Sequence, residues 1–162
     1  MTQIRLFLLL LMVVFVFQAK AQQKAVRLLT IDQLEKRVSH QDTVFIVNFW
    51  ATWCGPCVKE LPVFDQLQKT YKNQPLKVLL ISMDFKSKLN TAVVPFVQNH
   101  HFTSEVFLAD KSSEQEFIDR IDKNWSGALP GTLVINTKKN LHKFYEQEFT
   151  YPELNKLYQN SK

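Results

Sequence analysis

The stretch NFWATWCGPCVKELP, residues 48–62, contains both cysteines of this 162-residue chain, Cys54 and Cys57. The residues TVFIVNFWA, 43–51, lead directly into it, are apolar on both faces and are rich in β-branched and aromatic side chains. That composition is typical of a strand buried inside a parallel sheet. After Cys57 the apolar residues recur at helical spacing, although Pro62 lies among them and is expected to kink the helix. The cysteine pair is therefore predicted to lie where a buried strand passes into a helix.

Segments with strand and helix patterns alternate along the rest of the chain, and no element is expected between the N-terminal leader and Thr30. Further strands are predicted at 77–85, 105–110 and 132–138, with a hairpin partner within 141–149. Further helices are predicted at 30–40, 90–99, 112–123 and 151–162, with Pro95 inside the second of them. This alternation predicts an α/β sandwich to which the last hairpin adds antiparallel strands at one edge.

The first residues have the pattern of a secretory signal peptide. One early positive charge precedes an unbroken apolar run at 6–17, and an A-x-A pattern ends at Ala21. The twelve apolar residues would rise about 18 Å as a helix, against a hydrocarbon core of about 30 Å, so a membrane anchor is the weaker alternative. We expect a signal peptide at 1–21 and one soluble domain at 22–162, periplasmic or otherwise extracytoplasmic.

Charge and length restrict the function classes. Removing residues 1–21 would lower the formal net charge from +5 to +3, and the basic residues are scattered among acidic ones. No nucleic-acid or polybasic membrane surface is indicated. The 141 residues of the expected mature chain suit a single core, and a monomer is expected. One disulfide closing so small a loop would stabilise the fold little, so the cysteine pair needs a chemical explanation.

Metal and haem binding explain the pair poorly. A zinc site would need two further ligands, but none of the four histidines has the usual paired spacing, and His100 and His101 are adjacent. A c-type haem requires CxxCH, whereas Val58 follows Cys57. Reversible redox chemistry fits better, because residues three apart on a helix have Cα atoms about 5 Å apart, within the range that a disulfide tolerates. No metal or cofactor is expected.

The position of the pair on the helix predicts different roles for the two thiols. If Cys54 precedes the first turn, unpaired backbone N–H groups and the helix dipole stabilise its thiolate, which makes it the nucleophile. Cys57 lies one turn deeper on the apolar face and should be the shielded, resolving thiol. Pro56 fits this placement, because the first turn of a helix does not need its N–H.

The motif WATWCGPC resembles the active site of the thioredoxin superfamily. With the export signal before it, NFWATWCGPCVKELP is more narrowly similar to the exported TlpA/ResA/DsbE-type thiol-disulfide oxidoreductases. The resemblance implies a three-layer sandwich, with a central mixed sheet flanked by helices. It also implies a surface-exposed first cysteine and a cis-proline that faces the pair.

The cis-proline implied by the resemblance is Pro130, in WSGALPGTLVI directly before a predicted strand. The alternative is an ordinary trans proline at a strand start. The residue before it, Leu129, would offer backbone groups to an extended substrate segment. Many relatives carry Thr where this chain has Gly131, which leaves the shape of the substrate groove open. The 73 positions from Cys57 to Pro130 leave room for an inserted strand-helix unit at 105–123, as in the TlpA/ResA branch, where such a unit is expected to influence partner choice.

Side chains around the pair complete the predicted site. Trp53, Gly55 and Pro56 are expected to contact substrate at its rim. Glu60 lies three residues after Cys57, so it is a helix neighbour, and the exported family has a Glu at this place. We expect Glu60 to accept the proton of Cys57, with an ordinary exposed glutamate as the alternative. Cytosolic thioredoxins carry a buried Asp at the place of Asn48, whose amide cannot titrate.

Two of the three tryptophans lie outside that rim. Trp50 is expected in the core, and Trp125 is as compatible with packing as with contact. The predicted activity is thiol-disulfide exchange that reduces disulfides in exported partner proteins. A disulfide oxidase or isomerase, and a non-catalytic binding module on the same fold, remain alternatives; a copper-handling protein would normally show a different cysteine spacing and a histidine ligand.

Electrons for such a reductase would come from a membrane thiol transporter, as the resemblance implies. Apocytochrome c thiols in cytochrome c maturation, a spore or envelope protein, and general repair of exported cysteines are all compatible substrates.

Overall fold

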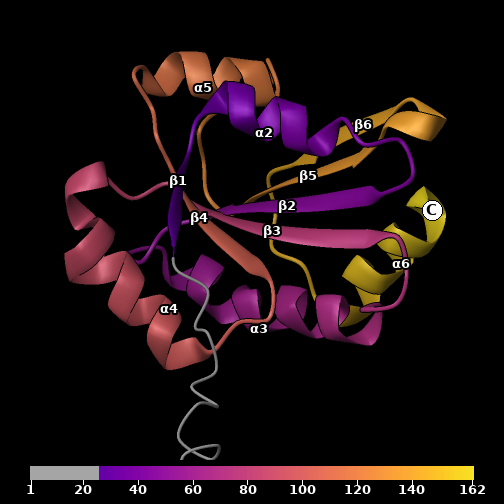
Figure 1. The fold of residues 1–162 in the computed structure, drawn as a ribbon, viewed down its shortest axis with the longest axis horizontal. Coiled ribbons are helices and arrows are strands. Elements are labelled where there is room, and N and C mark those ends of the chain that lie inside the picture. The colour runs from indigo at the N-terminus through magenta and orange to yellow at the C-terminus, as the bar shows by residue number, and fades with distance from the viewer. Residues whose placement is uncertain (1–25) are drawn as a thin grey trace, which may run out of the picture.

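A computed structural model describes residues 26–162, and the expected signal peptide at 1–21 lies outside these residues. Six strands form one sheet in the order β1-β4-β3-β2-β5-β6 (Figure 1). The pairs β1/β4, β4/β3 and β3/β2 are parallel, and β2/β5 and β5/β6 are antiparallel. The strands are β1 Arg27–Leu29, β2 Val44–Trp50, β3 Leu76–Ser82, β4 Glu105–Ala109, β5 Gly131–Asn136 and β6 Leu141–Tyr145.

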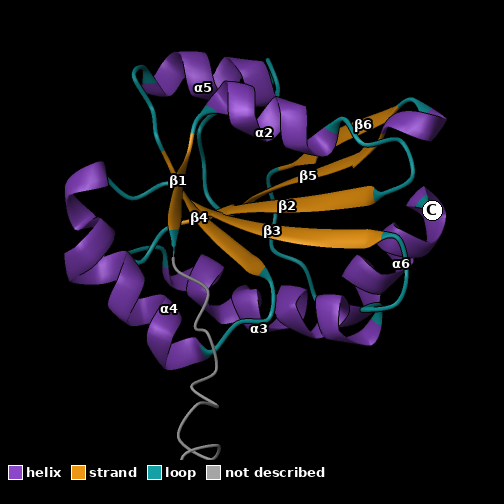
Figure 2. Ribbon diagram, viewed as in Figure 1, coloured by secondary structure: helices purple, strands orange, loops and turns teal. Residues whose placement is uncertain are grey.

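Helices cover both faces of the sheet, which makes three layers (Figure 2). The α-helices of the described residues are α2 Ile31–Val38, α3 Gly55–Thr70, α4 Val94–His100, α5 Glu114–Ile121 and α6 Tyr151–Ser161. Helices α3, α4 and α6 share one buried cluster with the sheet, and α2 and α5 share the other. The chain therefore has the mixed-sheet sandwich that the alternation of strands and helices predicted.

Strand β2 lies in the middle of the sheet, and all seven of its residues are buried. Successive side chains point to opposite faces of a strand. Ile46 and Trp50 accordingly join the cluster under α3, whereas Val47 and Phe49 join the cluster under α2 and α5. Burial on both faces explains why this segment is almost continuously apolar.

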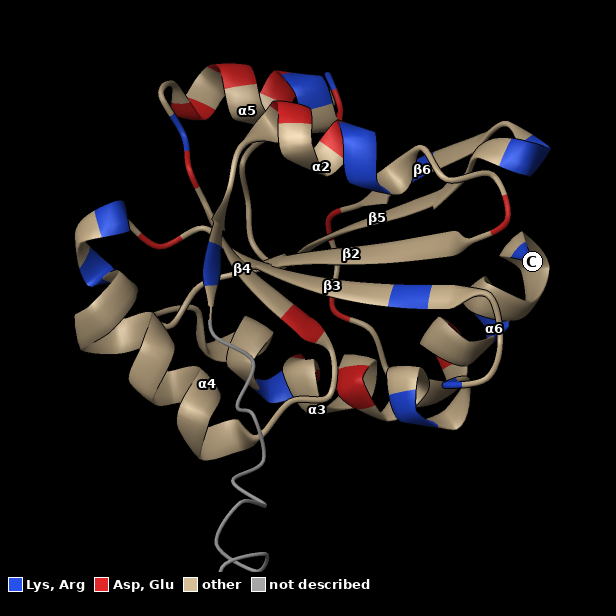
Figure 3. Cartoon of the chain, in the orientation of Figure 1, with Lys and Arg blue, Asp and Glu red and all other residues tan. Residues whose placement is uncertain are grey.

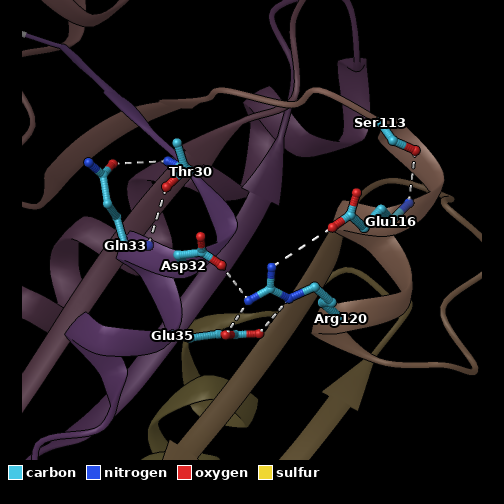
Figure 4. A network of polar contacts seen from close by, with 7 residues as sticks. All are labelled: Thr30, Asp32, Gln33, Glu35, Ser113, Glu116 and Arg120. Carbon is cyan, nitrogen blue, oxygen red and sulfur yellow. Dashed lines mark hydrogen bonds and ion pairs between the residues drawn. The ribbon is translucent and has the colours of Figure 1, made fainter.

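Helices α2 and α5 lie side by side on one face and share a cluster of ion pairs (Figure 4). Arg120 of α5 contacts Asp32 at 2.6 Å and Glu35 at 2.5 Å, both from α2, and Glu116 at 4.0 Å. These side chains are partly or largely exposed, so each pair contributes little to stability. Lys and Arg are interspersed with Asp and Glu on α2, α3 and α5 in Figure 3, as on an ordinary solvated surface, whereas α4 carries neither.

One strand was missed, and several predicted bounds differ from those in the structure. Arg27–Leu29 forms β1, because pairing with β4 gives this short segment a partner that local sequence does not show. The strand predicted at 77–85 ends at Ser82. The helix predicted at 90–99 is a π-helical turn at Leu89–Val93 followed by α4, which places Pro95 in the first turn, where its missing N–H costs nothing.

The predicted strand-helix unit at 105–123 is present as β4 and α5. Strand β4 lies between β1 and β3, so the unit widens the parallel half of the sheet by one strand. It leaves the central pair β2/β3 and the antiparallel pair β2/β5 in contact, and these are the strands that carry the site.

Candidate active site

The turn after β2 places Cys54 at the start of α3. Helix α3 begins at Gly55, and Cys54 is its N-cap residue, in an extended backbone conformation. The N–H of Cys57 donates to the Cys54 sulfur at 3.3 Å, and Pro56 lies in the first turn. Cys54 therefore lies where it was predicted, before the first turn of the helix and within reach of a helix N–H.

Cys54 and Cys57 form a disulfide, with their Cα atoms 5.3 Å apart. Cys57 is fully buried and Cys54 is 7 % exposed. The first cysteine is thus the more accessible one, but much less exposed than the resemblance implied. Gly55 and Pro56 between them are exposed, and a Cβ on Gly55 would meet no other atom within 4 Å.

An aspartate from the neighbouring strand end holds the turn before Cys54 in place. The N–H and hydroxyl of Thr52 donate to the two carboxylate oxygens of Asp84 at 2.9 and 2.6 Å. Ser82 donates to the same carboxylate at 2.7 Å. Asp84 is buried and follows β3, so the parallel pairing of β2 and β3 brings these groups together. This anchor was not predicted, because Asp84 lay inside the strand expected at 77–85; an aspartate at the end of an otherwise apolar segment is the signal that could have found it.

The antiparallel pairing of β2 with β5 brings the proline loop to the cysteine end of β2. Phe49 pairs with Gly131, so Pro130 lies beside the last residues of β2, next to the turn that carries Cys54. The Leu129–Pro130 peptide bond is cis. Leu129 is half-buried and packs against the cluster that includes both cysteines.

The packing around Gly131 leaves little room for a larger residue. A Cβ at Gly131 would lie 2.7 Å from a ring carbon of Phe144 in β6. The ring of Phe144 also packs against that of Trp125 in a tilted arrangement, with centroids 4.8 Å apart. Phe144 and Trp125 therefore occupy the space that a larger residue would need, so the glycine does not leave an empty groove.

Glu60 is buried, so the alternative of an ordinary exposed glutamate is wrong. Only 3 % of the residue is exposed, and it lies one turn after Cys57 on the face of α3 that packs on the sheet. One carboxylate oxygen accepts from the Asn48 side-chain amide at 2.8 Å. The other accepts from the backbone N–H of Phe149, just before α6, at 2.8 Å. Asn48 and Phe149 are functional-site neighbours that spacing in the sequence could not reveal.

Burial sets the charge state of Glu60. Removing the carboxyl from water raises its pKa, the two hydrogen bonds lower it, and the nearby exposed Glu148 raises it again, with a net pKa of about 7. Among the causes of this pKa there is no cation from residues 26–162. A carboxyl group with a pKa near neutrality has the pKa that an effective proton acceptor needs at that pH.

Trp50 and Trp53 lie in the core and at the surface respectively, as expected. Trp53 is 70 % exposed beside Cys54, whereas Trp50 is fully buried. Trp125 is also buried, and its indole N–H donates to the Ala128 carbonyl at 2.9 Å, so it packs beneath the proline loop. Phe85, directly after Asp84, is 70 % exposed as well.

Within residues 26–162 no three His, Cys, Asp or Glu side chains are grouped so that they could hold a metal ion. None of the helices in this part of the chain combines the length and the apolar character needed to cross a membrane.

The fold and the site together define a thioredoxin-like protein with a CxxC pair at the start of a helix. Residues 25–105, half of the chain, match the family model described as Thioredoxin. The chain therefore belongs to the thioredoxin family.

Similar proteins include a thioredoxin of Buchnera aphidicola, 35 % identical over 41 % of this chain and 58 % of that protein. The thiol-disulfide oxidoreductase ResA of Oceanobacillus iheyensis is 28 % identical over 67 % of this chain and 52 % of its own length. The chain thus spans about half the length of these relatives. Among solved structures, a thioredoxin-related protein of Neisseria meningitidis serogroup B is 25 % identical, with a TM-score of 0.64 over 76 % of this chain and 87 % of that one.

Proposed function

We propose that this chain is an extracytoplasmic thiol-disulfide oxidoreductase that reduces disulfides in partner proteins with the Cys54/Cys57 dithiol. The observation that carries the proposal is the placement of the pair: two cysteines at disulfide distance, the first as the N-cap of α3 and the second fully buried. Backbone N–H groups at a helix start stabilise a thiolate there. The similar ResA is named for the same class of reaction.

The reaction follows from the different environments of the two sulfurs. The Cys54 thiolate attacks one sulfur of a partner disulfide, and the other partner sulfur leaves as a thiolate. Cys57 then gives its proton to Glu60 and attacks the Cys54 sulfur of the mixed disulfide. The partner sulfur leaves with the bonding electron pair and takes a proton from solvent. The partner has gained two electrons, and the chain holds the disulfide seen in the structure.

The surface around Cys54 supplies places for a partner segment. Trp53, Gly55 and Pro56 are exposed next to the disulfide, and the backbone of Leu129 borders the same end of β2. An extended partner segment would pair with Leu129 as a short additional strand. Export rests on the leader at 1–21, and electrons would come from a membrane thiol transporter.

A trapping experiment tests the exchange reaction. Cys57→Ser should leave exported partner proteins linked to Cys54, whereas Cys54→Ser should trap none, because the attacking sulfur is missing. In the reduced protein Cys54 should also be alkylated faster than Cys57. Equal trapping by both variants, or faster alkylation of Cys57, contradicts the assignment of roles.

The direction of exchange is tested by a redox titration. Reductases with Gly-Pro between the cysteines have potentials on the order of −270 mV, against about −180 mV for an isomerase and about −120 mV for a strong oxidant. We expect a value well below that of the isomerase. A potential near that of the oxidant would make the chain a disulfide oxidase.

A further inference from the structure

The side-chain amide of Asn48 uses only one of its two ends. The residue is fully buried in β2, and its NH2 group donates to Glu60 Oε1 at 2.8 Å, with Thr132 Oγ1 at 3.3 Å and the Gly131 carbonyl at 3.5 Å. The amide oxygen, Oδ1, has no hydrogen-bond donor among the described residues. A buried acceptor without a partner costs about 1–3 kcal/mol, so an unpaired oxygen in the middle of the sheet calls for a physical reason.

In Glu60, by contrast, both acceptor oxygens are used, and an added proton would have no acceptor without a rearrangement. Both of its oxygens accept hydrogen bonds, one from Asn48 and one from the N–H of Phe149. This arrangement suits an ionised carboxylate, which can only accept. A protonated Glu60 has an O–H that must donate, and neither the Phe149 N–H nor the Asn48 NH2 can receive it. The unpaired Oδ1 of the same Asn48 amide can.

We propose that the Asn48 amide turns over by half a turn when Glu60 takes up a proton. Oδ1 then accepts the Glu60 O–H from the position that the NH2 group has left. The hydroxyl of Thr132, which is both donor and acceptor, rotates to donate to the same Oδ1. Because the oxygen and NH2 group of an amide are nearly equal in size, the turn fits a packed interior. When Glu60 loses the proton, the amide turns back.

This arrangement gives each protonation state of Glu60 a partner, and one end of the amide stays unpaired in either state. Its use in exchange rests on the proposed function, in which Glu60 holds the Cys57 proton while the thiolate attacks. The neutral acid would otherwise be an unsatisfied buried donor. Glu60 contacts the Asn48 amide of β2 and the Phe149 N–H before α6, and the charged side chain that acts on it is Glu148, also before α6. Thr132 of β5 contacts the same Asn48 amide. The Asn48 amide is therefore a positioning group for Glu60.

Nuclear magnetic resonance on the oxidised protein tests the turn without any exchange partner. Above the Glu60 midpoint, the Asn48 NH2 protons should show Overhauser contacts to Thr132. Below it those contacts should weaken strongly, with the same midpoint as the Glu60 carboxyl carbon. Contacts to Thr132 of unchanged intensity on both sides of the Glu60 midpoint overturn the proposal, even if exchange activity is normal.

Glu60→Gln is the matched control, because Gln resembles the protonated acid. Its oxygen must face the Phe149 N–H, so its NH2 group faces Asn48 and should hold Oδ1 toward it at every pH. We expect the Asn48 signals of this variant to match the low-pH form of the natural protein and not to titrate. An Asn48 amide that still contacts Thr132 in this variant contradicts the proposal, and if the variant fails to fold, the titration of the natural protein decides alone.

A double-mutant cycle tests the consequence for exchange. Asn48→Leu removes both ends of the amide and should slow single-turnover resolution of the mixed disulfide by roughly tenfold, about one hydrogen bond to a charged group. Added to Glu60→Gln, the Asn48→Leu change should not slow resolution beyond the rate of Glu60→Gln alone, because both changes act on the same proton transfer. If the rate loss of the double variant equals the product of the two single losses, Asn48 and Glu60 act independently and the proposal is overturned. Absence of exchange in the natural protein would instead refute the proposed function.

Discussion

Two buried carboxylates lie five residues apart on α3, and their surroundings give them opposite properties. Glu60 is 3 % exposed and Asp65 is 4 % exposed. Asp65 Oδ1 receives the N–H and hydroxyl groups of Thr103 and Ser104 at 2.7–3.0 Å, and Lys69 lies 2.8 Å from Oδ2. Burial raises the pKa of Asp65, but these hydrogen bonds outweigh it and hold the pKa below its ordinary value. Glu60 has two donors and no cation among the described residues that contact it, and its pKa is raised to about 7.

The difference shows that burial alone does not decide the charge of a carboxyl group. The number of donors and the presence of a cation decide whether the desolvation penalty is offset. Asp65 stays ionised and ties α3 to the segment before β4, a structural role. Glu60 has a pKa of about 7, so it can take up and release a proton close to neutral pH.

The largest expected effect is on the structural member of the pair. Asp65→Ala should lower the free energy of unfolding by about 3–5 kcal/mol, because it removes the acceptor of the N–H and hydroxyl of buried Ser104, and of those of exposed Thr103. Urea unfolding measures this loss. The control Lys69→Met removes only the half-exposed cation and should cost no more than about 1 kcal/mol. If Asp65→Ala lowers the free energy of unfolding no more than Lys69→Met does, Asp65 has no special structural role and the contrast with Glu60 fails.

Glu60 should have the opposite effect on stability. Its raised pKa means that the native state binds more protons than the unfolded chain between about pH 4.5 and 7. The free energy of unfolding should therefore fall by up to about 3 kcal/mol over this window as pH rises, and stay level above it. Glu60→Gln should lack this slope. Urea unfolding at several pH values compares the two proteins, and parallel curves would show that Glu60 is ionised throughout.

Asp65 should act at the acid end instead. Its lowered pKa contributes stability that is present above the ordinary value of 3.8 and is lost as pH falls through the folded pKa. Asp65→Asn should flatten this acid limb, because its amide does not titrate and binds no proton in either the native or the unfolded state. Acid unfolding followed by circular dichroism measures the change. An unchanged acid limb would mean that other carboxyl groups govern acid unfolding.

The smallest effect concerns the charge next to Glu60. Glu148→Gln should lower the pKa of Glu60, because the like charge is removed. The pKa should fall by only a few tenths, since an exposed charge interacts weakly through water. A carboxyl-carbon titration detects the change, with Glu116→Gln on the opposite face as the control. Equal changes in both variants would indicate a general effect of net charge.

Much of the fold could be predicted from local sequence. The apolar segment before Cys54 predicted the central strand, and helical spacing after Cys57 predicted α3. The resemblance implied the cis bond at Pro130, which the structure has. These features depend on neighbours in the chain or on a motif that occupies consecutive positions. Strand β1 was missed because its three residues are too few to show a strand pattern, and they form a strand only by pairing with β4.

The charge state of Glu60 was decided by the tertiary structure. The sequence placed a carboxyl group one turn after Cys57 and an amide six residues before Cys54, and it could show neither burial nor contact. Asn48, Thr132 and Phe149 reach one another only through the pairing of β2 with β5 and the return of the chain to α6. Desolvation and hydrogen bonding depend on every group within a few ångströms, and those groups come from segments up to 89 residues apart. Local sequence therefore determines which residues can do the chemistry, and packing determines the pH at which Glu60 can do it.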